Sequence, residues 1–217
     1  MNAIELVYSD NTLLVVNKPA GLLSVPGRGP GKEDCVVSRV NVLHPSARSV
    51  HRLDCATSGL MVLAHNADSH RALSRQFQER EVAKRYIACV SGALAQDEGE
   101  ANAPLMADWP NRPRQMVHTE GKQALTYYRC LSRYKILSRN SMQQMDVSRV
   151  ELRPVTGRSH QLRVHMLTLG HAILGDQLYA QGAALDASPR LMLHAQYLSF
   201  FHPDSKDRLE FEIDAPF

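Results

Sequence analysis

The sequence has no long hydrophobic run. Its apolar stretches fall well short of the roughly 20 residues that a membrane-spanning helix needs, and no N-terminal segment combines a basic start with an apolar core. We therefore expect a cytoplasmic protein with no membrane partner. With 217 residues, of which 44% are hydrophobic and 22% charged, the chain is long enough to build one substantial core.

Cysteine is scarce, and the metal-binding spacings are missing. No Cys-x-x-Cys pair occurs among Cys35, Cys55, Cys89 and Cys130, which excludes a zinc ribbon and a dithiol redox motif. His160 and His165 do not have the i, i+4 spacing of a zincin helix, and no glutamate follows His160. We expect free thiols and no bound metal.

A strong net charge is also missing. The 25 basic and 22 acidic residues leave a formal charge of +3, so a nucleic-acid partner would have to bind local basic clusters. One cluster is the loop "PGRGPGKED" (26–34), whose glycines would let Arg28 and Lys32 reach phosphates. The loop lacks the Gly-x4-Gly-Lys spacing of a phosphate-binding loop, so we expect no nucleotide cofactor.

Strand-like and helix-like segments are mixed along the chain without a repeat, a low-complexity tract or a clear linker. We predict one α+β domain over residues 1–217, with a central mixed, mainly antiparallel sheet flanked by helices and loops. Residues 178–190 are expected to form a loop. Expected strands lie within 12–27 (two short runs around a Lys-Pro turn), 60–64, 84–92, 124–134, 143–157, 191–202 and 208–213, and expected helices span 66–81 and 159–169.

The second expected helix has clear end signals. Ser159 is a good N-cap and Gly170 a good C′ residue. Arg163 is predicted at the edge of the buried stripe, where its guanidinium could turn toward an interior site instead of bulk water. That stripe consists of Leu162, Met166 and Leu169.

A carboxylate stands in an unusual place in "SVHRLDCATSGLMVLA" (49–64). In an extended segment alternate side chains share a face, so Arg52 and Asp54 would lie side by side. The turn residues 57–59 and the buried strand 60–64 would hold Asp54 on a rigid rim. From these residues alone, a functional site and an ordinary surface ion pair both stay open.

The segment 104–123, "PLMADWPNRPRQMVHTEGKQ", breaks the regular pattern with three prolines. An exposed arm with Trp109 as a stacking residue, together with Arg112 and Arg114, would suit single-stranded RNA. The alternative is that this tryptophan is a local packing anchor.

Four motifs together indicate a family. "HRLDCATSG" resembles the His-Arg-Leu-Asp-x-x-Thr-Ser-Gly signature of RluA-type pseudouridine synthases. The segments "VVNKPAGLLSVPG", "KRYIACV" and "GRSHQLRVHM" resemble the opening, tyrosine and arginine motifs of that family, in the same order. The resemblance implies a pseudouridine-synthase-like domain. Because the chain starts at the opening motif, we expect no S4-like N-terminal domain.

The resemblance implies isomerisation of uridine to pseudouridine within RNA, without a cofactor. Matched residue by residue, Asp54 is the catalytic aspartate and Arg163 its partner. Arg52 fills the stack when the base flips out, and Tyr86 lies against the flipped uracil. The other expected RNA contacts are His51, Thr57, Arg28, Lys32, Arg112 and Arg114.

A carboxylate can assist cleavage of a glycosidic bond in two ways. It either attacks the anomeric carbon or removes a proton from the neighbouring sugar carbon, and the sequence leaves both routes open. A glycoside hydrolase would ordinarily need a second carboxylate, which none of the motifs supplies. The rival from another class is a non-catalytic RNA-binding or chaperone module.

The substrate expectation comes from "DWPNRPRQMV" and "GKQALTYY". These segments resemble the family member that modifies both a 23S rRNA hairpin and tRNA anticodon stem-loops. We therefore expect a monomer that binds these stem-loops. The alternative is the same chemistry at other uridines of large-subunit rRNA.

Overall fold

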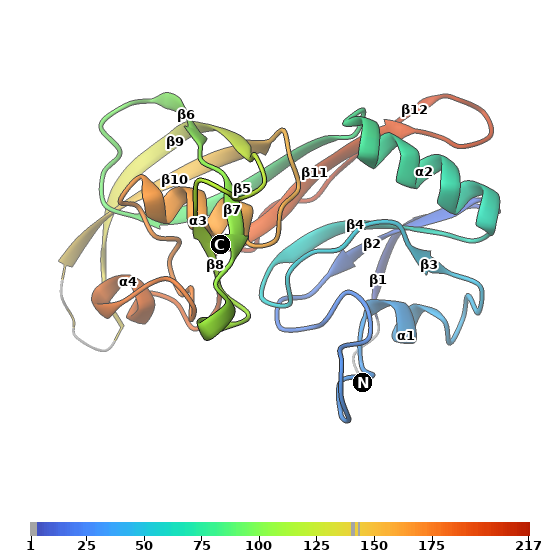
Figure 1. The fold of residues 1–217 in the computed structure, drawn as a ribbon, viewed down its shortest axis with the longest axis horizontal. Coiled ribbons are helices and arrows are strands. Elements are labelled where there is room, and N and C mark those ends of the chain that lie inside the picture. Colours follow the sequence, from blue (N-terminus) through green and yellow to red (C-terminus); the bar gives the residue numbers. More distant parts are fainter. Residues whose placement is uncertain (1–3, 140–141, 143) are drawn as a thin grey trace. The chain divides into compact units, whose positions relative to one another are not determined.

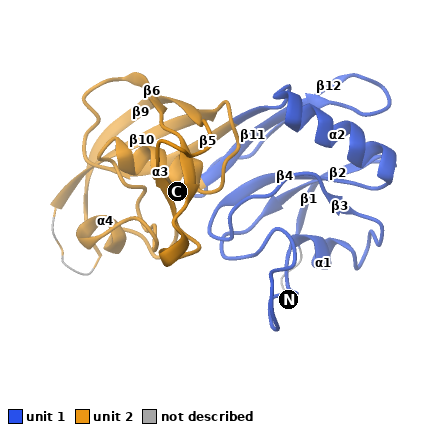
Figure 2. Ribbon diagram, in the orientation of Figure 1, with its two compact units in different colours: residues 1–84, 194–216 blue, residues 85–193, 217 orange. Residues whose placement is uncertain are grey.

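A computed structural model of the chain describes residues 4–139, 142 and 144–217. It shows an α+β fold with a mixed, mainly antiparallel sheet, as the sequence predicts (Figure 1). The chain divides into two compact units (Figure 2). Unit 1 comprises the chain up to Lys84 together with His194–Pro216, and unit 2 comprises Arg85–Leu193 with Phe217.

Unit 1 is a sheet with a helix on each face. Its strand order is β1-β2-β4-β11, with β3 paired to β4 and β12 to β11. All these pairs are antiparallel except β4 with β11, which makes the sheet mixed. The elements are β1 (Glu5–Ser9), β2 (Leu13–Lys18), α1 (Val36–Val40), β3 (Arg48–Ser49), β4 (Ser58–Ala64), α2 (Ala67–Glu79), β11 (Leu193–Phe201) and β12 (Arg208–Glu212).

Strand β2 is apolar at successive positions because both of its faces are covered. Leu13 and Val15 pack in one core cluster with Leu73 of α2. Leu14 packs in a second cluster with Val36 of α1. A strand that is buried on both faces reads as a continuous hydrophobic run. This explains how β2 and β4 form the centre of the unit.

The close approach of β4 and β11 depends on Gly59. Its backbone has a φ of +116°, a region that residues with side chains rarely adopt. A Cβ atom at this position would lie 2.3 Å from the carbonyl oxygen of Ala195. Glycine is therefore required where the two strands pair in parallel.

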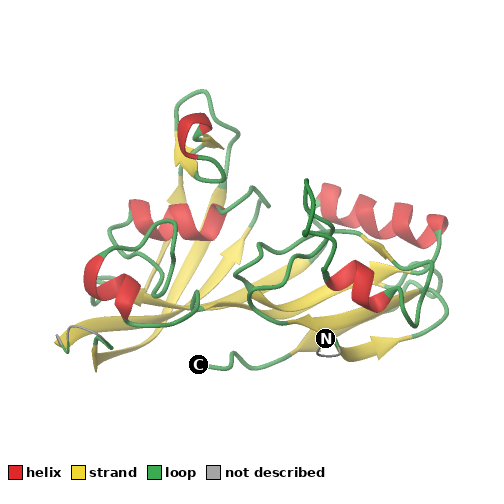
Figure 3. Ribbon diagram, turned by 90° about the horizontal axis from the view of Figure 1, so that it is seen from below, coloured by secondary structure: helices red, strands yellow, loops and turns green. Residues whose placement is uncertain are grey.

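Unit 2 is an antiparallel sheet with the strand order β5-β10-β9-β6, to which a separate hairpin of β7 and β8 is added. Helix α3 packs against β6, β8 and β9. Figure 3 shows the β7–β8 hairpin standing out from this sheet. The elements are β5 (Ala83–Ser91), β6 (Glu98–Asn102), β7 (Leu105–Ala107), the 3-10 helix η1 (Trp109–Asn111), β8 (Gln115–Val117), β9 (Leu125–Leu137), β10 (Gln144–Pro154), α3 (Gln161–Thr168) and α4 (Gly182–Asp186).

Most of the predicted elements are confirmed. Helix α2 begins after Asn66, whose side chain accepts hydrogen bonds from two backbone N–H groups of the first turn. The buried strand at 60–64 and the strands β5, β9, β11 and β12 lie where the pattern predicts them. The first residue of the predicted strand 143–157, Gln143, lies outside the described residues.

Three local predictions are wrong. The run after Pro19 is a loop rather than a strand, and the turn before β4 falls at residues 55–56 instead of 57–59. The expected loop 178–190 contains the short helix α4. Ala184 of this helix packs against the core cluster of Cys89 and Leu174, so tertiary burial favours a helix where the sequence shows only loop-like residues.

The start of α3 also differs from the prediction. His160, in the left-handed conformation with φ +53°, precedes the helix, and Ser159 is not its N-cap. Gln161 organises this end, because its Oε1 accepts a hydrogen bond from the backbone N–H of Arg158 at 3.0 Å. Arg163 is 4% exposed, so its side chain turns toward the interior, as the prediction allowed. The helix is buried from Gln161 to Met166 rather than along one stripe, and Leu169 is only partly buried.

Candidate active site

Asp54 lies in unit 1, on the segment between β3 and β4, and is partly exposed. The preceding residue, Leu53, is buried and bonded through both of its backbone polar groups. The Oγ of Ser24 donates to the Leu53 carbonyl at 2.7 Å and accepts from the Leu53 N–H at 3.0 Å. The N–H of Thr57 donates to the carbonyl of Asp54 at 3.1 Å. The carboxylate therefore stands on a fixed backbone.

A fully buried lysine, Lys18, donates hydrogen bonds to the backbone of the segment that carries Asp54 and to the run after β2. The Nζ of Lys18, at 0% exposure, donates to the carbonyls of Pro19 at 2.9 Å, Leu22 at 2.6 Å and Cys55 at 2.9 Å. The N–H of Gly21 also donates to the Cys55 carbonyl at 2.9 Å. In the run after Lys18, the carbonyls of Pro19 and Leu22 therefore point to an ammonium group and not to a neighbouring strand. Sequence reasoning missed this residue, although a lysine ending an apolar run is a visible signal.

His51 and Thr57 make interior contacts. The Nε2 of His51 accepts a hydrogen bond from the N–H of Val62 at 3.1 Å, and its ring stacks on Phe77 at 4.4 Å. Burial, and secondarily the nearby ammonium of Lys84, lowers the pKa of His51 to about 3, so the imidazole is neutral at pH 7. Thr57 is 2% exposed. The His51 side chain supports β4 through Val62, the Thr57 side chain is enclosed, and the assignment of both to RNA binding stays a prediction.

The cationic residues predicted in unit 1 face solvent. Arg52 is exposed and its neighbour Leu53 is buried, so exposed and buried side chains alternate here although residues 52–54 are not part of a strand. Arg28 and Lys32 are also exposed, on a loop where Gly29 has a φ of +94°. These three side chains are accessible to an anionic ligand.

Tyr86 and Arg163 belong to unit 2. Tyr86 is partly exposed on β5 and pairs with Leu152 of β10. Arg163 of α3 binds the carboxylate of Asp176 with two hydrogen bonds, from Nε at 2.7 Å and from Nη2 at 2.5 Å. Both side chains of this ion pair are almost fully buried, at 4% and 1% exposure. Sequence reasoning missed Asp176, for which the only signal is an acidic residue after an apolar run.

Tyr179 connects Arg163 to the hairpin. The Cζ of Arg163 lies 5.0 Å from the Tyr179 ring centroid, and the Cζ of Arg114 lies 5.4 Å from it. The Tyr179 hydroxyl accepts a hydrogen bond from the backbone N–H of Gln115 at 2.7 Å and is 2.8 Å from the Nδ1 of His160. The hairpin and α3 are thereby held in one arrangement.

Arg112 lies at the tip of the same hairpin. Its Cζ is 3.1 Å from the ring centroid of Trp109, which is 64% exposed. Of the predicted residues, the structure thus brings Arg52 and Asp54 onto one segment of unit 1. It brings Arg114 and Arg163 to one tyrosine in unit 2.

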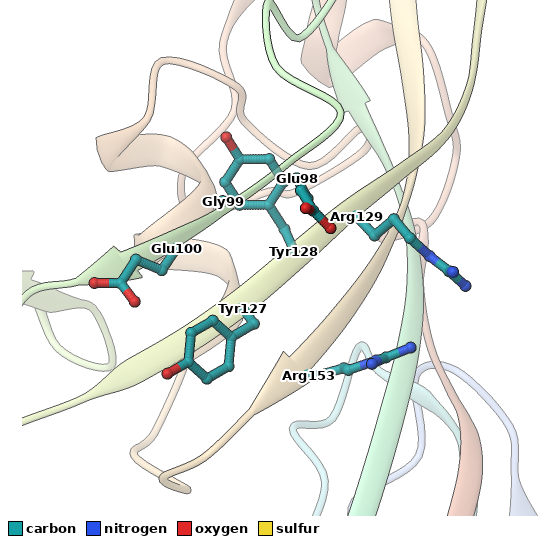
Figure 4. Close-up of a pocket in the computed structure, with 7 residues that line it drawn as sticks. All are labelled: Glu98, Gly99, Glu100, Tyr127, Tyr128, Arg129 and Arg153. Carbon is teal, nitrogen blue, oxygen red and sulfur yellow. The ribbon is translucent and has the colours of Figure 1, made fainter.

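A pocket of about 450 Å³ lies on the sheet of unit 2 and contains none of the predicted residues. Figure 4 shows Arg129 and Arg153 pointing the same way from β9 and β10, with Tyr128 turned away. Both arginines bind the buried Glu151, at 3.6 Å and 2.6 Å. The pocket is lined by Glu98, Gly99, Glu100, Tyr127, Tyr128, Arg129 and Arg153.

Among the described residues, no group of histidine, cysteine, aspartate and glutamate side chains is arranged to hold a metal ion. Within the same part of the chain, no helix has the length and apolar character that crossing a membrane requires. The four cysteines are free thiols.

Comparisons with known proteins agree on one family. The family model of RNA pseudouridylate synthase matches residues 12–168. A dual-specificity RNA pseudouridine synthase RluA of Yersinia pestis is 52% identical over 98% of this chain and 99% of its own length. The protein of that name in Escherichia coli K12 is 47% identical, over 99% and 94%.

Solved structures give the same result. Human RNA Pseudouridylate Synthase Domain Containing 1 superimposes with a TM-score of 0.81 at 29% identity, over 99% of this chain and 84% of that one. Human RNA Pseudouridylate Synthase Domain Containing 4 gives a TM-score of 0.73 at 26% identity, over 98% and 88%. With the match over residues 12–168, these likenesses show that the chain belongs to the RNA pseudouridylate synthase family.

Proposed function

We propose that this chain isomerises uridine to pseudouridine in stem-loops of 23S rRNA and of tRNA anticodon arms, with Asp54 as the catalytic carboxylate. The observation that carries the proposal is the Asp54 segment itself. In a chain of this family, it presents a partly exposed carboxylate on a backbone held by Ser24 and Lys18. Rigid placement of a reacting group is what catalysis of this kind needs.

The proposed reaction conserves all the atoms of the nucleoside except one exchangeable hydrogen. The bond from C1′ to N1 of uracil breaks, the base turns, and a bond from C1′ to C5 forms. The hydrogen on C5 leaves to solvent, and N1 takes up a proton. Asp54 assists the first cleavage in one of two ways. It attacks C1′, and the bond it forms to C1′ breaks again when C5 bonds to C1′; or it removes the proton on C2′ and returns a proton to C2′ when C5 bonds to C1′.

The proposed roles of the other residues follow the family motifs they match. Arg52 takes the place of the extruded base, Tyr86 lies against the uracil, and Arg163 is the partner of Asp54. Extruding a base from a stacked loop costs a few kcal/mol, which inserted side chains and aromatic contact help offset. The exposed position of Arg52 supports its role.

The proposed substrates rest on the relatives named dual-specificity RNA pseudouridine synthases, which match nearly the full chain. In a strain that lacks this gene, pseudouridine mapping of total RNA is expected to show loss at one uridine of a 23S rRNA hairpin and at one in tRNA anticodon stem-loops. Restoring the gene returns both. Loss only at other large-subunit sites would overturn the substrates and retain the isomerase.

Arg52→Ala is expected to slow product formation on a folded stem-loop more than on a short RNA whose target uridine is already unstacked. The reason is that its proposed work is to replace the extruded base. The measurement is the single-turnover rate on the two RNAs.

Arg48→Ala is the matched control, because Arg48 is an exposed arginine of β3 in the same unit. It removes the same charge and should leave the ratio of the two rates unchanged. Equal slowing of both substrates by Arg52→Ala would show that Arg52 does not act in base extrusion.

A further inference from the structure

Trp109 is largely exposed to solvent, although tryptophan is a residue type that gains much from burial. It is the single tryptophan of the chain and the first residue of η1, at the tip of the β7–β8 hairpin. Its side chain is 64% exposed. A buried aromatic ring contributes more apolar area than most residues. Exposure of this extent is not that of a local packing anchor, so the ring is available for a ligand.

The tip that carries Trp109 is closed by its own hydrogen bonds. The N–H of Asp108 donates to the carbonyl of Arg114 at 3.0 Å, and the N–H of Arg114 donates to the carbonyl of Asn111 at 3.0 Å. The Nδ2 of Asn111 donates to both carboxylate oxygens of Asp108, at 3.1 and 3.0 Å. Directly after the tip, the backbone N–H of Gln115 donates a hydrogen bond to the hydroxyl of Tyr179. The ring is therefore presented by an ordered support.

Arg112 places a positive charge against the indole ring of Trp109. Its guanidinium carbon lies 3.1 Å from the ring centroid of Trp109, so a cation covers one face of the indole. Trp109 is still 64% exposed with Arg112 in this position, so most of its surface remains open to a second flat group. An aromatic plate with a cation beside it is the combination that proteins use to hold an unpaired base and its phosphate.

We propose that Trp109 is a stacking site for one unpaired nucleobase of the RNA substrate, with Arg112 fixing the ring and attracting the adjacent phosphate. This inference rests on the proposed function, and it adds a base-binding residue to those assigned from the four motifs. The charge of the tip favours RNA over an apolar protein partner. Residues 108–114 carry two arginines, of which Arg112 is exposed and Arg114 partly exposed, against the single carboxylate of Asp108.

The single tryptophan provides a direct measurement. Titrating a substrate stem-loop into the protein is expected to quench the emission of Trp109, because stacking on a base places the indole against a π system. A fully paired duplex of equal charge is the reference RNA and should quench far less. Single abasic substitutions across the loop then identify the partner, as the one that removes the quenching.

Affinity supplies the second readout. Trp109→Ala is expected to weaken binding of the stem-loop by about five- to a hundredfold, the range found when a stacking aromatic residue is removed, whereas Trp109→Phe retains part of the affinity. Leu131→Ala, which shortens an exposed apolar residue of β9 in the same unit, is the control and should change nothing.

Salt dependence separates the two residues of the tip. Trp109→Ala should leave the slope of log affinity against log salt unchanged, since no phosphate contact is lost. Arg112→Ala should reduce that slope by about 0.7–0.9.

Two negative results have different meanings. Unquenched emission together with an affinity of Trp109→Ala within twofold of the unaltered protein would overturn the stacking site and leave the isomerase intact. Failure of the unaltered protein to form pseudouridine in any RNA would instead overturn the proposed function.

Discussion

Asp54→Asn is expected to stop product formation while RNA binding and folding persist. The amide keeps the shape of the side chain but lacks the charge and basicity that either route requires, so the single-turnover rate should fall by at least about 10²- to 10⁴-fold. Tritium release from uridine labelled at C5 measures the reaction, because isomerisation exchanges that hydrogen. Filter binding of the same RNA measures affinity.

The matched control for this change is Asp68→Asn, which neutralises an exposed carboxylate of α2 in the same unit. It should leave tritium release unaltered. If Asp54→Asn turned over a good substrate at a substantial rate, the catalytic assignment would be wrong. If the unaltered protein bound RNA and released no tritium from any substrate, the chain would be a binding module.

Asp176→Asn is expected to be the most destabilising of the conservative changes in unit 2. Asp176 and Arg163 form a doubly hydrogen-bonded ion pair at 1% and 4% exposure. Removing the charge of Asp176 takes from the buried guanidinium the carboxylate that binds it with two hydrogen bonds, and breaking a buried ion pair typically costs about 3–5 kcal/mol. Urea unfolding of the two proteins measures this loss.

A double variant then separates stability from chemistry. Replacing both members, with Arg163→Met and Asp176→Asn together, removes the buried charges and should recover much of the lost free energy of unfolding. Tritium release should stay lost, because the proposed partner of the catalytic aspartate is absent. Recovery of both properties would assign Arg163 a purely structural role.

Local sequence patterns predict the elements well where burial is simple. Strand β4 is one example, because its continuous apolar run is buried at every position. Helix α2 is another, because Asn66 caps its first turn. Motif resemblance assigns Asp54 and Arg52 to the site, and those assignments stay predictions. The separation of the chain into two units is not visible in the sequence, since no composition shift marks Lys84 or His194.

The residues that the sequence does not reveal are those whose partners converge from distant segments. Lys18 looks like an ordinary turn lysine until the carbonyls of Leu22 and Cys55 are seen around its Nζ. From the sequence, Asp176 looks like an ordinary loop residue. The structure shows that its carboxylate forms a buried ion pair with Arg163. A buried charge is tolerated only with several polar partners, and such partners come from tertiary structure.

The parallel contact of β4 with β11 at Gly59 sets an order of events during synthesis. Gly59 has left the ribosomal active centre long before Ala195 is made, with a delay on the order of 10 s at about 5–20 residues per second. During that interval the part of β4 that pairs with β11, at Ser58 and Gly59, lacks that strand, and the segment bearing Asp54 belongs to an incomplete sheet. Unit 2 is synthesised entirely within the same interval, apart from Phe217. Apart from that residue, the unit that holds the aspartate begins first and is completed last.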